Sequence, residues 1–311
     1  MSTIPLETEP PVGGEQRSAS GVEGRSPLRL ALTRLRRDGV AVASAAVIVL
    51  MVALAVTAPL IAHLTGHSPT AQYRTTGLTP EGLPVGPNRT FWFGTDNLGR
   101  DVFIRVVYGT RISLLVGVVS TLLAVVLGVL VGVTAGYFRG AVDTVLARFM
   151  DVVLCLPFLL FAIALVAVAG PSIAVSVGVI AFFSWAAVGR VVRGQTLSIR
   201  EREYIQAARL LGAGHLRIMF VEILPNLVAP VIVYTTLLIP TAIVFEATLS
   251  FLGMGVVPPT PTWGNMLADS LQYYQVAWWF VLFPGLALLI TTLAFNLLGD
   301  GIRDALDPTH G

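Results

Sequence analysis

The stretch EREYIQAARLLGAGHLRIMFVEILPN, residues 201–226, lies between two long apolar stretches and decides how the chain is organised. It is too polar to span a membrane and too regular to be a disordered loop. Glu201 and Glu203 precede a helix-favouring run, residues 207–211, which Gly212 follows. Acids at the start and glycine at the end are typical of a short helix. The sequence therefore predicts a helix-turn-helix outside the membrane, held between two spans and shaped to dock another protein.

Apolar stretches dominate the rest of the chain. Hydrophobic residues make up 55% of the sequence and charged residues only 12%, too few to cover a soluble protein of this length. Six stretches are each roughly long enough to cross a ~30 Å hydrocarbon core. They are residues 40–62, 112–135, 152–169, 172–189, 227–250 and 278–298. We therefore predict an all-α membrane protein with six transmembrane helices, the third and fourth of which form a tight hairpin at Gly170-Pro171.

The N-terminal region divides into two parts. Residues 1–28 are rich in Pro, Gly, Ser and Glu, a composition that favours a disordered tail. Residues 29–62 hold a basic segment and the first span. A cleaved signal peptide is the alternative, because Ala53-Leu54-Ala55 resembles a cleavage site and Arg36-Arg37 resembles a twin-arginine signal. The apolar stretch exceeds the usual length of about 7 to 15 residues in a signal peptide, so we expect the first helix to be retained.

The distribution of arginine predicts the orientation. Residues 29–37, 136–151, 190–226 and the C-terminal tail, 299–311, hold most of the arginines, so both termini are expected to be cytoplasmic. The segment 63–111 also carries five arginines, although the alternation of spans puts it outside; long loops translocate largely regardless of charge. Within it we expect an amphipathic helix, residues 100–108, lying along the outer surface before the second span.

Several classes of chemistry are excluded or unsupported. All 20 basic residues are arginine, and a P-loop ATPase or a Schiff-base enzyme needs a lysine. The single cysteine, Cys155, permits no intramolecular disulfide. His63 and His67 have i, i+4 spacing, but no acidic or cysteine cluster accompanies them, so we expect no metal site. The net charge of +2 argues against a nucleic-acid partner. No catalytic residues are expected.

Two features inside the predicted spans leave alternatives open. Gly117, Gly128, Gly132 and Gly136 share one face of the second span, which suits either close helix packing or a face that slides or lines a pathway. Glu246 lies near the outer end of the fifth span, where an ionisable group is expensive. It either pairs with an arginine of the outer loop, the interpretation we favour, or receives a positively charged group of a substrate.

Four motifs together resemble one family of membrane proteins. The segment 201–226 resembles the cytoplasmic signature of ABC importer permeases, and three other segments resemble the C-type permease of the dipeptide, oligopeptide and nickel importer family. Gln206 and Glu222 depart from the usual pattern, which has an acid and an isoleucine there. The signature residues are Glu203, Ala207, Ala208, Gly212, Leu224 and Pro225, and the other segments are FGTDNLGRDVFIRVVYGTRISLLVG (93–117), EATLSFLGMGVVPPTPTWGNML (246–267) and FPGLALLITTLAFNLLGDGIRDALDP (283–308).

This resemblance implies a fold, partners and a function. The fold would be that of a type I ABC importer permease in the bacterial inner membrane, with a five-helix core over residues 112–298 and a cytoplasmic coupling helix over 201–215. The partners would be a homologous permease forming a heterodimer, two cytoplasmic ATPase subunits that bind ATP and magnesium, an external substrate-binding protein and membrane lipid. This chain would need no cofactor and would be no enzyme.

The resemblance implies that the cargo is a di- or oligopeptide. The alternative cargo is nickel or another small solute. The alternative protein class is a secondary transporter that acts alone. Such a transporter predicts broken helices in an internal repeat, which the sequence does not show clearly. The proline-rich outer loop around Trp263 either contacts the binding protein, covers the outer mouth, or is simply an ordered loop.

Overall fold

The computed structural model describes the backbone of residues 27–306 and the side chains of residues 32–306. Most of the predicted disordered tail, residues 1–28, lies outside this range. Within it the chain is helical, and it forms no strand beyond two isolated bridges. The elements are α1 (Pro27–Arg37), α2 (Gly39–Thr65), α3 (Val102–Phe138), α4 (Gly140–Cys155), α5 (Phe158–Ala169), α6 (Ile173–Arg200), α7 (Glu203–Leu210), α8 (His215–Arg217), the π-helix η1 (Ile218–Ile223), α9 (Leu224–Phe251), α10 (Trp263–Ser270) and α11 (Trp278–Leu306).

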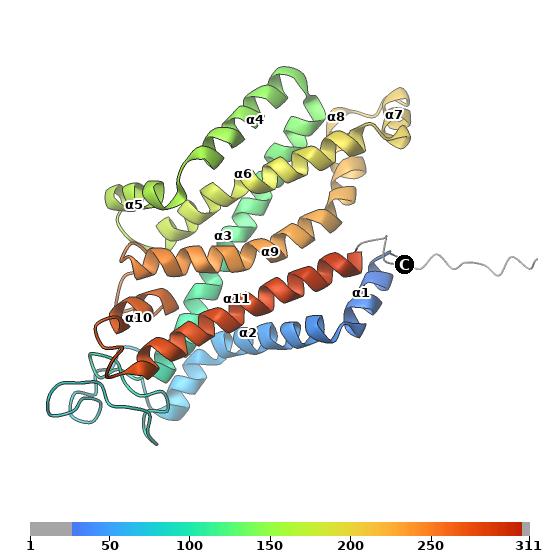
Figure 1. Cartoon of the computed structure of the whole chain (residues 1–311). Helices are drawn as coiled ribbons and strands as arrows, with labels where there is room; N and C mark the ends of the chain where they lie inside the picture. Colours follow the sequence, from blue (N-terminus) through green and yellow to red (C-terminus); the bar gives the residue numbers. More distant parts are fainter. Residues whose placement is uncertain (1–26, 307–311) are drawn as a thin grey trace, which may run out of the picture.

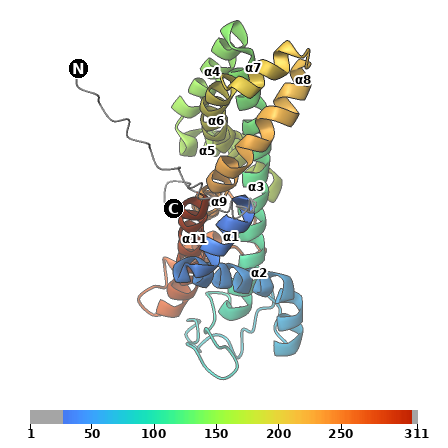
Figure 2. The same ribbon diagram turned by 90° about the vertical axis from the view of Figure 1, so that its right-hand side faces the viewer.

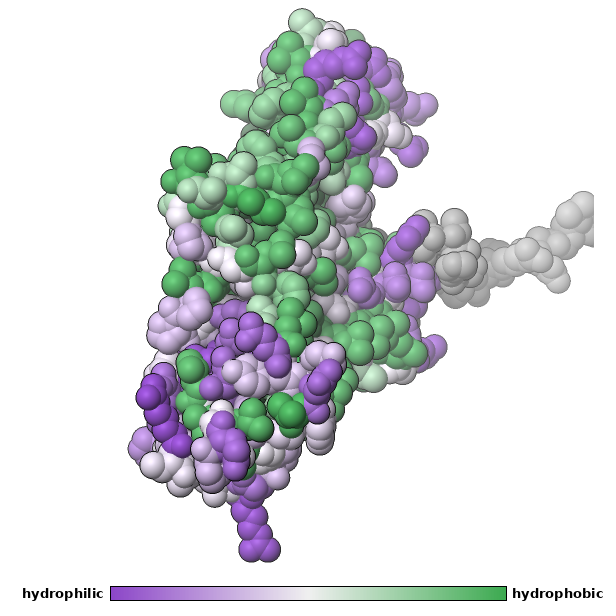
Figure 3. Space-filling model, turned by 60° about the vertical axis from the view of Figure 1, so that its left-hand side comes forward, coloured by the Kyte–Doolittle hydropathy of each residue, from purple (hydrophilic) through white to green (hydrophobic). Residues whose placement is uncertain are grey.

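The long helices form one bundle around α3. This helix packs against α2, α4, α6, α9 and α11. The segment that joins α2 to α3 lies at one end of the bundle beside α10, and α7 and α8 lie at the opposite end (Figures 1 and 2). Between these ends the surface shows mostly apolar side chains, whereas polar ones gather over the α2–α3 segment and near α7 (Figure 3). This division is what a membrane requires of a protein that crosses it.

Five helices in the described range are long and apolar enough to cross a membrane, and the sixth span is broken. The stretch 152–169, predicted as one span, is divided between α4 and α5, which are bent by 87° relative to each other. The bend lies at Pro157. Leu156, just before it, is extended (φ −72°, ψ 129°), because a residue before proline disfavours the helical conformation. The prediction of six spans holds if this bent pair counts as one.

Two helices extend beyond their predicted bounds. The separate amphipathic helix predicted at residues 100–108 does not form, because α3 begins at Val102 and runs without interruption for 37 residues. The side chain of Asp101 caps its first turn by accepting from the amide of Phe103 at 2.8 Å. At the other end of the chain α11 continues to Leu306, so most of the predicted tail is helical. Gly301 there lies close to Ala41 of α2.

Glycines on α3 allow α6 to approach very closely. Gly128, Gly132 and Gly136 all face α6, and a Cβ atom added to Gly132 would lie 2.6 Å from the carbonyl oxygen of Gly189. Gly117 faces α9 in the same way. Such small residues let helix backbones meet where lipid provides no hydrophobic driving force between them. In this conformation the glycine face is a packing interface inside the chain and does not line an open path.

Replacing Gly132 with alanine should therefore destabilise the bundle. The added methyl group overlaps a backbone atom that cannot rotate away, and overpacking of this kind costs typically about 1–3 kcal/mol. Gly178→Ala on α6 is the matched control, because a Cβ atom there meets no atom within 4 Å. Thermal unfolding in detergent should show a lower midpoint for Gly132→Ala only; equal midpoints for the two variants would contradict the close α3–α6 contact.

Candidate functional site: the α7 hairpin and the adjoining groove

The segment between α6 and α9 folds as a helical hairpin, residues 201–223, which we call the α7 hairpin. Its first helix is shorter than the predicted 201–215 and ends just before Gly212, whose φ of +80° favours glycine. The amide of Ala213 donates to the carbonyl of Ala208 at 3.0 Å, and that of Gly212 donates to Arg209 at 2.9 Å. These two bonds are the Schellman arrangement that ends many helices.

The underside of the hairpin is anchored in the bundle by apolar contacts. Ile205 is fully buried and belongs to a cluster with residues of α3, α6 and α9. Ile218, Met219 and Ile223 of the π-helix join the same cluster. A π-helix widens one turn, and such turns occur often at functional sites. The hairpin is therefore anchored to the bundle through Ile205 at its first helix and through the π-helix at its other end.

Polar contacts tie the hairpin to the end of α3 at Tyr137. The Tyr137 hydroxyl lies 2.9 Å from Nδ1 of His215, and the guanidinium of Arg200 donates to the Tyr137 carbonyl. The guanidinium carbons of Arg200 and Arg209 lie 5.8 and 5.4 Å from the centre of the Tyr137 ring, within the range of cation–π interactions. These contacts join α3, α6, α7 and α8 at one residue, so a force on the hairpin reaches three helices.

The tip of the hairpin exposes large apolar side chains. Leu210 and Leu211 are 89% and 87% exposed, and Leu216 is 69% exposed. Leu210 and Leu211 lie where α7 ends, and Leu216 lies in α8. Exposed apolar side chains on a rigid support are typical of a protein-binding surface.

The signature residues take different places around this tip. Glu203 lies in the first turn of α7 and is exposed; Ala207 is exposed and Ala208 is partly buried on the same helix. Leu224 and Pro225 begin α9 directly after the π-helix. The structure thus brings Glu203, Ala207, Ala208 and Gly212 together on one element and places Leu224 and Pro225 at its junction with the next span.

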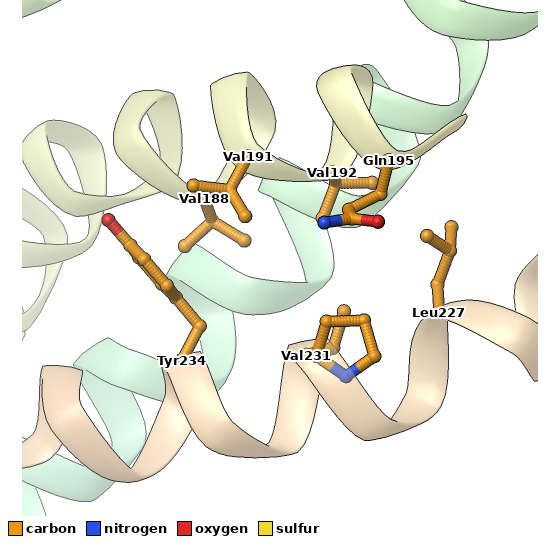
Figure 4. Close-up of a pocket in the computed structure, with 8 residues that line it drawn as sticks. Val188, Val191, Val192, Gln195, Leu227, Val231 and Tyr234 are labelled. Carbon is orange, nitrogen blue, oxygen red and sulfur yellow. The ribbon is translucent and has the colours of Figure 1, made fainter. Parts of the chain in front are cut away.

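A groove runs between α6 and α9 next to the hairpin (Figure 4). Its walls are mostly valine and leucine, with the polar side chains of Gln195 and Tyr234 among them. The narrow part holds a space of about 10 Å³, and it adjoins a wide groove of about 920 Å³ at the base of α7. Both are lined by Gln195 and Pro230, so the two are continuous.

The structure changes the interpretation of Glu246 and Trp263. Glu246 is fully buried, and its two carboxylate oxygens accept from the hydroxyls of Ser113 at 2.8 Å and Ser250 at 2.7 Å. Among residues 32–306 it forms no ion pair with an arginine, so the pairing that the sequence favours is wrong. Trp263 is also fully buried, and its indole N–H donates to the carbonyl of Val106 at 3.3 Å. Neither side chain is open to cargo in this conformation.

A buried ionic network occupies the end of the bundle opposite to the hairpin. The Asp96 carboxylate is fully buried and lies 2.6 Å from Nε of Arg100 and 3.3 Å from Nε of Arg105. Arg100 also reaches Asp269 of α10 at 3.4 Å. Burial raises the pKa of the Asp269 carboxyl above its ordinary value, and the nearby Arg100 opposes that shift. The network joins the α2–α3 segment to α10.

His67 forms a hydrogen bond with an acidic side chain of the same region. Its Nδ1 lies 2.5 Å from the carboxylate of Asp101, the residue that caps α3. Burial raises the pKa of the Asp101 carboxyl, and the hydrogen bond to His67 opposes that shift. In the described part of the chain no three His, Cys, Asp or Glu side chains gather as metal ligands. The sequence analysis did not predict these contacts, although the acids on both sides of Arg100 were the available signal.

Two known families match the sequence. The model of the family described as "Binding-protein-dependent transport system inner membrane component" matches residues 128–310, more than half of the chain. The chain belongs to this family. A second model, the "N-terminal TM domain of oligopeptide transport permease C", matches residues 26–80 of the permease.

Individual relatives agree with this assignment. The permease is 42% identical over 283 residues to the dipeptide transport system permease protein DppC of Alkalihalophilus pseudofirmus, covering 91% of this chain and 90% of that one. It is 44% identical over 259 residues to the di/tripeptide transport system permease protein DppC of Pseudomonas aeruginosa, covering 83% and 84% of the chains. It is 40% identical over 284 residues to the glutathione transport system permease protein GsiD of Pectobacterium atrosepticum, covering 91% of this chain and 92% of that one.

The fold also matches that of a solved ABC transporter. A chain of the MetNI methionine ABC transporter, determined in inward-facing conformations, is similar with a TM-score of 0.54 and 18% sequence identity. The match covers 65% of the permease and 96% of that chain. The permease therefore has the predicted type I importer fold.

One departure from the family signature has a local explanation. The Gln206 side chain donates from Nε2 to the carbonyl of Glu201 at 3.2 Å, across the start of α7. An acidic side chain, the usual residue here, cannot donate in this way when ionised. The permease thus keeps a polar residue at this position and uses it to hold the entry of the hairpin.

Replacing Ile205 with alanine should loosen the hairpin from the bundle. Truncating a buried isoleucine costs about 2–5 kcal/mol, and here the loss falls on one short element. Leu210→Ala is the matched control because that side chain is exposed. Hydrogen exchange in residues 203–223 should become faster in Ile205→Ala and stay unchanged in Leu210→Ala. Unchanged exchange in Ile205→Ala would mean that the buried contact does not hold the hairpin.

Proposed function

We propose that this permease is one transmembrane subunit of an ATP-driven importer of di- or oligopeptides, and that the α7 hairpin couples it to ATPase subunits. The observation that carries the proposal is the pair of exposed leucines, Leu210 and Leu211, on a hairpin fixed to three spans. The names of the relatives, which carry dipeptides, di- and tripeptides and the tripeptide glutathione, support a peptide as cargo.

The proposed partners of this permease supply the functions that it does not perform itself. A homologous permease forms the other half of the pathway, two cytoplasmic ATPases hold ATP and magnesium, and an external binding protein delivers the peptide. This chain needs no cofactor and performs no catalysis; it has no lysine with which to bind nucleotide phosphates in a P-loop. Nickel or another small solute remains the alternative cargo.

In the membrane orientation that we propose, both termini and the α7 hairpin lie in the bacterial cytoplasm. Arginine placement supports it, because α1 ends with Arg34, Arg36 and Arg37 and the segment 190–226 holds six arginines against three glutamates. The α2–α3 segment and α10 then face the outside, where the binding protein docks.

In the proposed mechanism, movement of the ATPases is transmitted to the transmembrane helices through the α7 hairpin. When the ATPases bind ATP and close, the α7 hairpin moves with the ATPase surface that holds its leucines. The contacts at Tyr137 and Ile205 pass this displacement to α3, α6 and α9. The two permeases then open the pathway alternately to the outside and to the cytoplasm, which requires a bundle with two discrete arrangements.

The direct test replaces both Leu210 and Leu211 with glutamine. Because these side chains are exposed, the permease should fold normally while losing the apolar contact with the ATPases. We expect co-purification of the ATPases to fall by tenfold or more, as for loss of a binding hot spot of about 2 kcal/mol. Leu216→Gln should have a smaller effect if the contact centres on the turn. A stoichiometric ATPase retained by the double variant would contradict the docking surface, and a wild-type permease that retains none would favour a lone transporter.

Gly212 offers a second test that acts through backbone strain. Alanine at a φ of +80° is strained by about 1–2 kcal/mol and should distort the turn that presents the leucines. Gly214→Ala is the control, because Gly214 has a φ of −69° and free space around it. Peptide-stimulated ATP hydrolysis by the reconstituted complex should fall in Gly212→Ala and persist in Gly214→Ala. Full stimulation in Gly212→Ala would argue against a coupling role for this turn.

A further inference from the structure

The short helix α5 is held to the bundle by apolar side chains alone. Its sequence, FLLFAIALVAVA, contains no side chain that can form a hydrogen bond or an ion pair. It packs against α6 and α9, beside the first turns of α6 and the last turns of α9 (Figure 1). Most of its side chains are exposed, among them Leu160 at 67% and Val168 at 88%. Because apolar contacts are not directional, α5 can shift on its neighbours without losing a side-chain hydrogen bond.

Both ends of α5 are places where the backbone changes direction. Pro157 precedes the helix at the 87° bend from α4. Gly170 follows it with a φ of +81°, and a Cβ atom added to Gly170 would meet no atom within 4 Å. Hinges are a few residues at the ends of elements that absorb changes in φ and ψ. The helix is therefore a short rod between two hinge positions.

The helices on either side of α5 are fixed to each other. α4 packs against α3 and α6, and the guanidinium of Arg190 lies 2.5 Å from the carboxylate of Asp151. Arg193 of α6 forms a second ion pair with Asp143 of α4. Both ends of α5 are thus held in place. Rotation about the line that joins the two hinge positions is the movement that remains for α5, as for a strap fastened at both ends.

Such a rotation would open the contact between α5 and α9. The ring of Phe158 stacks on that of Phe245 of α9, with the ring centres 4.0 Å apart. The same ring meets Phe183 of α6 edge-on at 5.3 Å. Aromatic pairs are favourable both when stacked with an offset and when edge-on. The rings can therefore change their arrangement while α5 moves, and the contact can form again when it returns.

The neighbouring parts of the same end of the bundle are locked together by buried polar contacts. Glu246 of α9 accepts from Ser113 of α3 at 2.8 Å, and Trp263 of α10 donates to the carbonyl of Val106 of α3 at 3.3 Å. The ionic network around Asp96 adds residues 66–101 to this unit. We call residues 66–101, α10 and the adjoining ends of α3 and α9 the outer cap. Separating its parts would leave buried donors and acceptors without partners, which is costly.

We propose that α5 is a hinged strap that swings away from α9 during transport, while the outer cap moves as one rigid unit. The outer side of the pathway then opens at the contact between Phe158 and Phe245, where no polar contact has to break. The proline-rich loop around Trp263 belongs to the rigid cap and is not a lid. This inference rests on the proposed function in ATP-driven import.

Two chemical cross-links distinguish a moving α5 from a moving cap. Cys155→Ser removes the single cysteine and provides the background. Phe158→Cys with Phe245→Cys places thiols on α5 and α9. Leu267→Cys with Gly285→Cys places them on α10 and α11, where a Cβ atom on Gly285 would lie 3.8 Å from the Leu267 side chain. The whole complex in liposomes, with binding protein and ATP, is treated with a short bis-methanethiosulfonate, and uptake of dialanine is measured before treatment, after treatment and after reduction.

We expect uptake to fall at least about tenfold when α5 is linked to α9 and to recover on reduction, because a step that must open is blocked. Linking α10 to α11 should leave uptake within about twofold, because the cap does not change shape. Unimpaired uptake with α5 linked would overturn the strap, and loss of uptake with α10 linked would overturn the rigid cap. Failure of the untreated wild-type complex to take up any dipeptide would instead refute the proposed function.

Spin labels at exposed positions test the same movement if the cross-linking variants fail to assemble. Leu160 of α5 is 67% exposed, and Leu98 and Leu271 near the cap are 38% and 55% exposed, so labelled cysteines there should leave the fold intact. Between the nucleotide-free and vanadate-trapped complex, the distance between labels at 160 and 271 should change by about one helical turn, ~5 Å. The distance between labels at 98 and 271 should stay constant. A constant first distance, or a changed second one, would contradict the proposal.

Discussion

The close contact between α3 and α6 is the constraint on which the rest of the structure depends. Without side chains at Gly128, Gly132 and Gly136, the backbone of α3 lies directly against α6 over two helical turns. This contact continues to the ends of both helices, where Tyr137 and Arg200 meet. The α7 hairpin is held firmly because the packed pair α3 and α6 next to it is rigid. The pair packs closely because the glycines of α3 have no side chains to keep the two backbones apart.

A rigid platform gives the hairpin a defined mechanical role. The hairpin is joined covalently to α6 and α9, and Tyr137 joins it to α3. A displacement at its tip therefore cannot be absorbed locally and must shift these helices relative to the rest of the bundle. The bend between α4 and α5 and the π-helix before α9 are the places where the backbone departs from regular α-helix. Such departures are where helices change direction with least disruption of hydrogen bonds.

Features that depend on local composition could be predicted from the sequence, and those that depend on distant contacts could not. The apolar stretches and the turn at Gly212 are local, and the structure has them. The partners of Glu246 lie 133 residues away at Ser113 and one helical turn away at Ser250, and only the packing of α3 on α9 brings all three together. The burial of Trp263 against α3 is non-local in the same way. Pro157 was visible in the sequence, but its effect on the third span depended on the helices around it.

Glu246 shows how this bundle accommodates an ionisable group with a structural role. It lies on an apolar helix near the end of a span, and its position in the sequence alone does not distinguish a structural role from a contact with cargo. Glu246 is enclosed, and the chain satisfies both of its oxygens, so its place is explained without any ligand. Its carboxylate links α9 to α3 through Ser113, so a rearrangement that separated these two helices would leave a buried oxygen without a donor, which is costly.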